Sequence, residues 1–111
     1  MSSLNGQQIN ATCGSVYINL NQEIISVNDG FSSILGYNIQ GLQGTKLESL
    51  LTRSSRTLFQ LYFLPLIKLN QKIDEMHLTF ISEHGQVIPL DVCIEASESD
   101  GQTLYKFTLH P

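Results

Sequence analysis

Five stretches of the chain alternate hydrophobic and polar residues, which is the pattern of strands that bury one face. The first two, at 15–20 and 23–28, are rich in valine, isoleucine and tyrosine and are separated by a short polar turn, so they predict an antiparallel hairpin. The other three, at 72–82, 86–97 and 103–110, are longer, and turns that contain glycine join them. The pattern predicts a sheet of five antiparallel strands.

The stretch ISVNDGFSSILGY, residues 25–37, is compatible with two different structures. An Asn-Asp-Gly run between apolar residues is a hairpin signal, because these residues tolerate the backbone angles of tight turns. The apolar residues that follow, however, are spaced three and four apart, which is one face of a helix. A helix at about 29–35, with Asn28 or Asp29 as its N-cap, therefore fits the stretch better than a second strand.

The clearest helical pattern covers residues 52–70, with Ser54 or Ser55 as the expected N-cap. Its apolar residues form a face wider than a surface helix needs, so we expect this helix to be pressed between the sheet and something else. Pro65 has no N–H to donate and crowds the preceding turn, which predicts a kink or a break near this residue. The segment 38–51 contains too many glycines for one long helix and predicts compact helical turns.

These elements together predict an α+β fold, in which a five-stranded antiparallel sheet has helices packed on one face. With 111 residues the chain has the usual size of one domain. We place that domain at 15–111, and the polar segment 1–14 is either a loose tail or a cap helix.

The formal net charge is -4, and the six lysines and arginines are scattered along the sequence, so no basic stripe is available for a nucleic acid backbone. No apolar run approaches the about 20 residues of a membrane span, and the first residues lack the pattern of a secretion signal. Cys13 and Cys93 are the only cysteines, which does not indicate a disulfide scaffold. We therefore expect a cytoplasmic domain with two free thiols, no nucleic acid partner and no membrane span.

Several short motifs, in a fixed order, resemble the Per-Arnt-Sim (PAS) sensor domain family. They comprise a strand that ends in asparagine, a capped helix with an aromatic residue, a Gly-Tyr pair and a Leu-x-Gly. The matching residues are Asn28, Phe31, Gly36, Tyr37, Leu42 and Gly44. The later HGQVIPLDV is similar to the family's hairpin between its third and fourth strands, and the resemblance covers about 15–110.

The run RTLFQLYFLPL, residues 56–66, is similar to a bacterial branch of the family. That branch is found on signalling kinases, such as the histidine kinases of two-component systems, and on cyclases and phosphatases. The resemblance implies a non-catalytic input domain for signal transduction. Such a domain binds a small ligand or cofactor between the sheet and the long helix, signals to an attached effector domain, and often forms a homodimer.

The candidates for the ligand pocket are the large apolar residues of the helices and of the core faces of the strands. They are Phe31, Ile34, Leu35, Leu47, Leu51, Phe59, Tyr62, Phe63, Leu78, Phe80, Leu90, Val92, Tyr105 and Phe107. Each of them is also a residue that a small domain needs for its core. Tyr62 and Tyr105 add hydroxyl groups that could orient a ligand.

The alternative interpretation is a ligand-free dimerisation and protein-interaction module. In this case the dimer would form through the outer sheet face and the first residues of the chain. That face is more apolar than solvent exposure requires. Its apolar residues are expected to be Ile73, Ile81, Val87, Pro89 and Cys93.

The family's known cofactors find little support in the sequence. Haem-binding members use a histidine on the long helix, but residues 52–70 contain none, and we expect His77, His84 and His110 to face solvent. Flavin photosensors use a cysteine near the start of that helix, and residues 46–70 contain none, so covalent flavin is disfavoured while noncovalent flavin stays open. The spacing of histidine, cysteine and acidic residues indicates neither a metal site nor an active site.

Overall fold

The computed structural model describes residues 13–111, so the expected tail or cap helix at 1–14 lies almost wholly outside the described residues. The strands are β1 (Gly14–Ile18), β2 (Ile24–Val27), β3 (Lys72–Ile81), β4 (Val87–Ser99) and β5 (Gln102–His110). The helical elements are α2 (Asp29–Leu35), α3 (Ile39–Leu42), the 3-10 helix η1 (Leu47–Leu50) and α4 (Arg53–Asn70). No helix within 13–111 is both long and apolar enough to cross a membrane.

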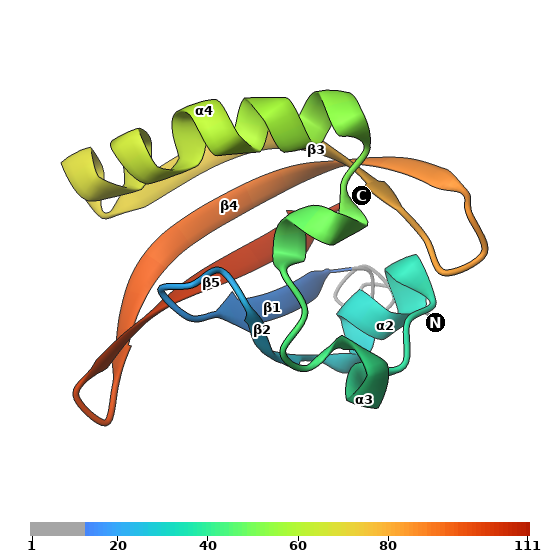
Figure 1. Cartoon of the computed structure of the whole chain (residues 1–111), viewed down its shortest axis with the longest axis horizontal. Coiled ribbons are helices and arrows are strands. Elements are labelled where there is room, and N and C mark those ends of the chain that lie inside the picture. Colours follow the sequence, from blue (N-terminus) through green and yellow to red (C-terminus); the bar gives the residue numbers. More distant parts are fainter. Residues whose placement is uncertain (1–12) are drawn as a thin grey trace, which may run out of the picture.

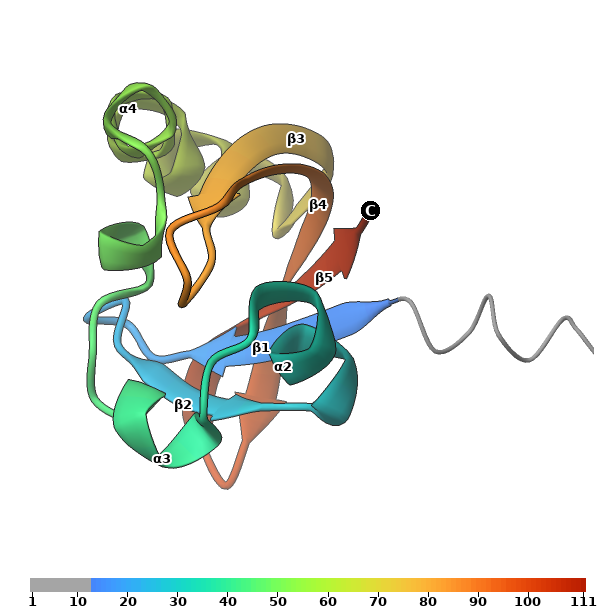
Figure 2. The same cartoon turned by 90° about the vertical axis from the view of Figure 1, so that its right-hand side faces the viewer.

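The five strands form one sheet in the order β2-β1-β5-β4-β3, and every neighbouring pair is antiparallel. The helical elements lie on one side of this curved sheet, with α4 along β3 and α2 against β1 (Figures 1 and 2). The predicted α+β fold is therefore confirmed. We call the face that the helices leave open the outer face.

The predicted hairpins have the expected turn chemistry. Gly85 in the β3–β4 turn has a φ of 87°, and in the β4–β5 turn Asp100 and Gly101 have φ values of 52° and 78°. Two successive residues with positive φ form the turn whose twist matches that of antiparallel strands. These turns fix the register in which β4 pairs with both of its neighbours.

Both edge strands are partly covered by other segments of the chain. On β3, the Thr79 carbonyl accepts a hydrogen bond from Thr52 N at 3.0 Å, and its amide donates to the Ser55 hydroxyl at 2.8 Å. On β2, the Ile24 amide donates to Thr45 O at 2.8 Å and the Ile24 carbonyl accepts from Gly44 N at 2.9 Å. These bonds anchor the start of α4 and the loop before η1 to opposite edges of the sheet.

A β-bulge in β3 places Ile73 differently from the prediction. Strict alternation from Met76 back to Ile73 put Ile73 on the outer face, but the pairing with β4 shifts between these two residues. The extra residue in the bulge moves Ile73 to the core side, where it is buried. The outer face is therefore less apolar than the sequence predicted.

Helix α4 differs from the prediction at two points. Its N-cap is Thr52, whose hydroxyl accepts from Ser55 N, rather than Ser54 or Ser55. Of the kink or break expected near Pro65, the break does not occur, because α4 runs as one helix from Arg53 to Asn70. Pro65 lies on the exposed side of the helix, where water can reach the carbonyl that it leaves without a partner.

Candidate functional site

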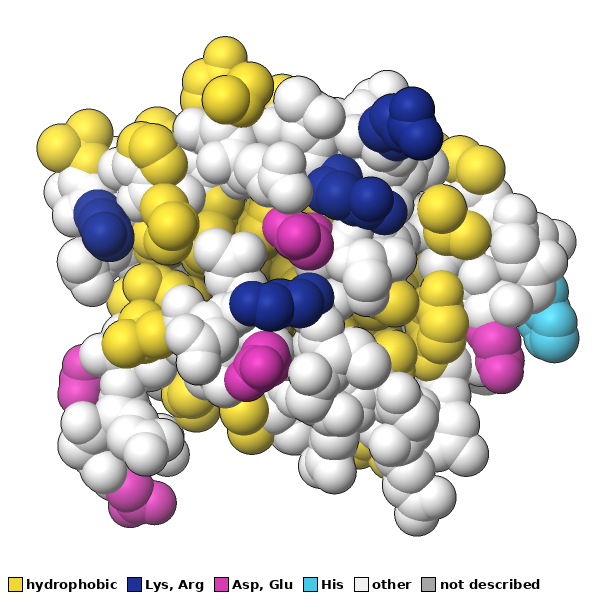
Figure 3. Space-filling model, in the orientation of Figure 1, with side chains coloured by type: hydrophobic (Ala, Val, Ile, Leu, Met, Phe, Trp, Pro, Cys, Tyr) yellow, Lys and Arg dark blue, Asp and Glu magenta, His cyan; other side chains and the backbone are white. Residues whose placement is uncertain are grey.

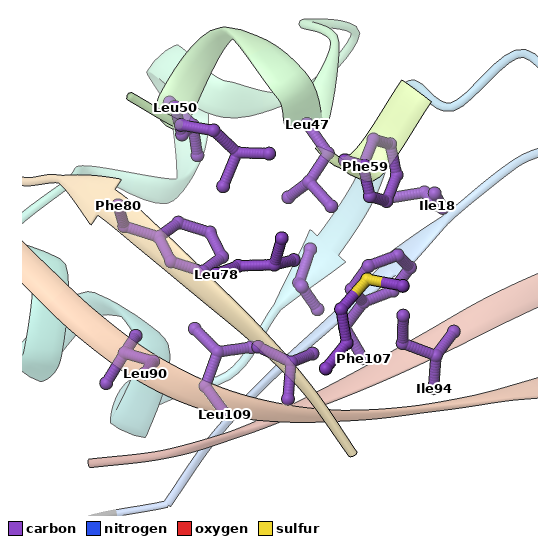
Figure 4. Packing of buried hydrophobic residues seen from close by; sticks show 14 of the residues in the cluster. Ile18, Leu47, Leu50, Phe59, Leu78, Phe80, Leu90, Ile94, Phe107 and Leu109 are labelled. Carbon is purple, nitrogen blue, oxygen red and sulfur yellow. The ribbon is translucent and has the colours of Figure 1, made fainter. Parts of the chain in front are cut away.

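The space between α4 and the sheet is filled by a cluster of apolar side chains. Four rings lie at its centre: Phe63 stacks on Phe59 with ring centroids 4.7 Å apart, and meets Tyr105 edge-on at 5.2 Å and Phe107 at 5.6 Å. Figure 4 shows how Phe80, Leu78 and Phe107 of the sheet point toward the side chains of α4 and η1. The structure thus brings together apolar residues from α4, from η1 and from all five strands.

Most of the predicted pocket residues belong to this buried cluster. The buried ones are Phe31, Leu35, Leu47, Leu51, Phe59, Phe63, Leu78, Phe80, Leu90, Val92, Tyr105 and Phe107. Ile34 is partly buried and packs against the cluster. These residues contact one another closely, so a ligand among them would have to displace side chains that are already packed.

Tyr62 lies elsewhere, on the side of α4 that faces away from the sheet, and is 51% exposed. It belongs to an apolar stripe on this outward side, which also contains Leu58, Leu61, Leu66 and Leu69. The spacing of three, four, seven and eight residues is that of one helical face. Figure 3 shows hydrophobic side chains at the surface along α4. We call these five residues the α4 stripe. Because Tyr62 belongs to this outward stripe, its hydroxyl cannot orient a ligand in the interior of the domain.

A solvent-open hollow of about 350 Å³ lies on the helical side of the domain, beside α3 and η1. Its lining combines apolar and polar groups, namely Tyr37, Asn38, Gly41, Leu42, Thr45, Ser49, Leu50 and Glu83. Leu42 and Leu50 also belong to the buried core cluster, so the hollow reaches the core from outside. Its volume is within the range of small-molecule sites.

Two motif residues of the sequence, Asn28 and Gly36, cap the two ends of α2. The Asn28 side chain accepts hydrogen bonds from Phe31 N at 2.8 Å and from Ser15 N at 2.9 Å, so it caps α2 and binds it to β1. Gly36, with a φ of 79°, ends α2 in the left-handed conformation that glycine adopts most readily. The hairpin alternative for residues 25–37 is therefore wrong.

Tyr37 joins the rim of the hollow to the sheet. Its hydroxyl donates a hydrogen bond of 2.6 Å to the carbonyl of Ile81 at the end of β3. Burial raises the pKa of the Tyr37 phenol above its usual value of 10.0, and the nearby Glu83 carboxylate adds to this increase. Both effects favour the protonated phenol, which is the form that can donate to Ile81.

This raised pKa predicts a dependence of stability on alkaline pH. The folded state holds the phenol proton more tightly than the unfolded state, so the contribution is complete below pH 10 and is lost as the pH rises through the folded pKa. We expect Tyr37→Phe to lose about 1 kcal/mol at pH 7, because one hydrogen bond is removed. The variant should also show a shallower loss of stability above pH 10.

Urea unfolding between pH 7 and 11 measures both effects. Tyr62→Phe is the matched control, because Tyr62 is half exposed and makes no such bond among the described residues. If the alkaline loss of stability were as steep in Tyr37→Phe as in the parent chain, the assignment to Tyr37 would be incorrect.

The described histidines and cysteines lie outside the buried core cluster. His77, His84 and His110 are all exposed, and none of them is on α4. Cys13 and Cys93 are free and partly buried, and Cys13 Sγ lies 3.6 Å from His110 Nδ1 at the start of β1. None of these histidines and cysteines belongs to the buried core cluster of the described residues.

Three exposed side chains on the outer face were missed by the sequence analysis. Glu75, His77 and Asp91 lie together there, although Asp91 is on a different strand. Spacing along the sequence does not reveal such a group. The alternation of β3 together with the register of the predicted hairpin could have shown it.

Comparison with known proteins agrees with the observed fold. The family model for the PAS domain matches residues 12–110. Phosphoserine phosphatase RsbP of Bacillus subtilis (strain 168) is 29% identical over 106 residues, which cover 95% of this chain and 26% of that protein. The chain therefore spans about a quarter of the curated relative that it matches.

Solved PAS structures superpose well at low sequence identity. A PAS domain of a two-component sensor histidine kinase has a TM-score of 0.76 at 15% identity, with 95% of this chain and 89% of that chain covered. One from Colwellia psychrerythraea has a TM-score of 0.77 at 12% identity, with coverages of 96% and 95%. The PAS-B domain of a Drosophila melanogaster Cycle variant, with bound glycerol, has a TM-score of 0.76 at 9% identity, with coverages of 87% and 97%. By its motifs, its fold and this family match, the chain belongs to the PAS domain family.

Proposed function

We propose that this PAS domain is a non-catalytic input module of a longer signalling protein, and that it binds a small molecule on the side of the sheet that the helices cover. The observation that carries the proposal is the hollow beside α3 and η1, whose apolar floor is continuous with the core. A ligand that enters there would contact the layer between sheet and helices. The glycerol bound to the related Cycle domain supports a small-molecule site in this fold.

The lining of the hollow indicates the chemistry of the ligand. Leu42 and Leu50 offer an apolar floor, whereas Thr45, Ser49 and Glu83 offer hydrogen-bonding groups at the rim. A small, mostly apolar molecule with one polar end fits this combination. By binding only one arrangement of the α3–η1 region, it would shift the domain toward that arrangement.

Ligand binding is tested by thermal unfolding with three probes, namely decanoate, indole and flavin mononucleotide, and by native mass spectrometry of the purified chain. We expect at least one probe to raise the melting temperature, and the increase should grow with the logarithm of the probe concentration once that concentration exceeds the dissociation constant. In Gly41→Trp the new side chain fills the hollow from α3, where a Cβ meets no other atom within 4 Å, and binding should be lost.

Gln40→Trp is the matched control, since Gln40 is exposed on α3 and does not line the hollow. It should bind the probe as the parent chain does. If Gly41→Trp bound the probe as tightly as the parent chain does, the ligand site would lie elsewhere. If no probe raised the melting temperature and native mass spectrometry showed no bound molecule, the result would argue against a ligand-binding sensor.

Helix α4 could carry the signal to an attached effector domain, because both of its faces are apolar. Phe59, Phe63 and Ile67 face the core, while the α4 stripe faces outward. The helix has three basic residues and no acidic one, although the chain as a whole has a net charge of -4. We therefore expect the effector to contact the stripe with apolar and acidic residues.

The effector contact is tested in the full-length protein with Leu61→Glu and Leu69→Glu. These substitutions should uncouple effector activity from the ligand while the melting temperature and ligand affinity of the PAS domain stay unchanged. Val87→Glu, at an equally exposed position on β4, is the control. Unchanged coupling in the two α4 variants would exclude the stripe as the contact. The relative RsbP suggests a phosphatase as one effector of this kind.

A homodimer through the outer face is the second candidate, and the exposure of Ile25 favours it. Ile25 is 40% exposed and lines a hollow on this face together with Tyr17 and Leu104. A second copy could cover these side chains. Sedimentation at several concentrations should show a dimer that Ile25→Arg dissociates and Leu20→Arg, in the exposed β1–β2 turn, does not. A monomer at all concentrations would refute the dimer.

A further inference from the structure

One group of side chains on the outer face has the chemistry of metal ligands. The ligand atoms of Glu75, His77 and Asp91 all lie within 4.8 Å of one another. Glu75 and His77 share the outer face of β3, and His77 stands directly opposite Asp91 of β4 in the register of the two strands. All three side chains are at least half exposed, so an ion can reach them from solvent.

The two nitrogens of His77 have different partners. Nδ1 is in hydrogen-bond contact with Asp91 Oδ1. With the proton on Nδ1, the imidazole donates it to Asp91 and keeps a free lone pair on Nε2. A carboxylate that holds a histidine in this way orients the ring and makes the other nitrogen a better ligand.

Nε2 of His77 faces Glu75 across a gap. The distance from Nε2 to Glu75 Oε2 is 3.6 Å, which is longer than a normal charge-assisted hydrogen bond. It is close to the separation of about 3.4 Å between two ligands that each bind a tetrahedral zinc ion at about 2.1 Å. The gap therefore has the size for one ion between the imidazole and the carboxylate.

The neighbouring strand adds a second histidine to the same row. His110 of β5 is the register partner of Asp91, and it lines a small hollow with His77, Asp91 and Pro111. Cys13 Sγ lies 3.6 Å from His110 Nδ1. Side chains that can bind soft or borderline metals thus follow one another across β3, β4, β5 and the start of β1.

We propose that Glu75, His77 and Asp91 form a binding site for a divalent transition metal ion, and that zinc is the ion best suited to it. His77 Nε2 and the Glu75 carboxylate bind the ion, Asp91 orients the imidazole, and water completes the coordination. The combination of one imidazole and carboxylates favours zinc over magnesium, which prefers oxygen ligands alone. A bound ion would link Glu75 and His77 of β3 at the point where His77 pairs with Asp91 of β4. This site lies on the outer face, and the proposed ligand hollow lies on the opposite side of the sheet.

The experiment is a calorimetric titration of the chain with Zn²⁺ after treatment with EDTA. We expect one site of micromolar affinity, weaker than structural zinc because the protein supplies fewer than four ligands. His77→Ala and Glu75→Gln should each weaken binding at least tenfold, and Asp91→Asn should weaken it about tenfold through loss of ring orientation. Mg²⁺ should neither bind nor compete.

His84→Ala is the matched control, because His84 is an exposed histidine in the β3–β4 turn without these neighbours. It should leave the affinity unchanged. All these positions are exposed, so the variants should keep the melting temperature of the metal-free chain. Absence of Zn²⁺ binding overturns the proposal. Binding that survives His77→Ala but is lost in His110→Ala or Cys13→Ser also overturns it, since the ion would then belong to that other pair.

Discussion

Replacing Gly30 by alanine is expected to destabilise the domain by about 3 kcal/mol or more, a large part of the about 5–15 kcal/mol that stabilises a typical domain. A Cβ atom at this position would lie 1.9 Å from the carbonyl oxygen of Cys13 and 3.2 Å from the Cα of Gly14. Both are backbone atoms, so they cannot rotate away as a side chain could. The start of β1 and the first turn of α2 would have to separate.

Helix propensity alone predicts the opposite result, namely that alanine at this position stabilises the domain. The sign of the change in stability therefore distinguishes the two effects. Gly30 is the second residue of α2, where alanine is intrinsically better than glycine by up to about 1 kcal/mol. Gly41 of α3 is the matched control, because a Cβ there meets no atom within 4 Å. Urea unfolding should show Gly41→Ala unchanged or slightly stabilised. If Gly30→Ala were equally stable, β1 and α2 would not be in contact as described.

Replacing Phe63 by alanine is expected to cost about 3–5 kcal/mol, the usual cost of deleting a fully buried aromatic ring. Phe63 is 1% exposed and contacts the rings of Phe59, Tyr105 and Phe107. Its removal leaves a cavity and takes away three aromatic contacts. Phe63 joins α4 to β5 through its contacts with Tyr105 and Phe107.

The adjacent Tyr62 provides the control for Phe63. It has a similar ring but is half exposed on the α4 stripe, so Tyr62→Ala should cost less than about 1 kcal/mol. Chemical unfolding measures both variants under the same conditions. Similar losses in the two variants would mean that α4 is rotated about its axis relative to this structure.

The sequence was sufficient for the order and type of the elements, because periodicity records which side of each element is buried. The helix at 29–35 and the three long strands appear within about two residues of their expected positions. The face of α4 was harder, since apolar residues occur on both its sides. Periodicity alone cannot tell which of two apolar stripes meets the sheet, and Tyr62 was placed on the wrong one for this reason.

Other features depend on contacts between distant residues and could not be read from local pattern. Gly30 looked like part of a turn signal, but its role is the close approach of β1 to α2. Ile73 lies in the core only because of a bulge in β3. The bulge changes the alternation of inward and outward side chains, and no residue in the local sequence indicates it. Glu75, His77 and Asp91 meet through strand register, and the hollow beside α3 forms from α3, η1, the loops next to them and the β3–β4 turn.

The hydrogen bonds at the two edges of the sheet have a consequence for aggregation. Amide and carbonyl groups at a free edge recruit strands from other molecules, which leads to aggregation. Here Thr52 and Ser55 occupy the backbone groups of Thr79 on one edge, and Gly44 and Thr45 occupy those of Ile24 on the other. At these positions the sheet has no free amide or carbonyl with which the strand of another molecule could pair, so the domain resists edge-to-edge association there.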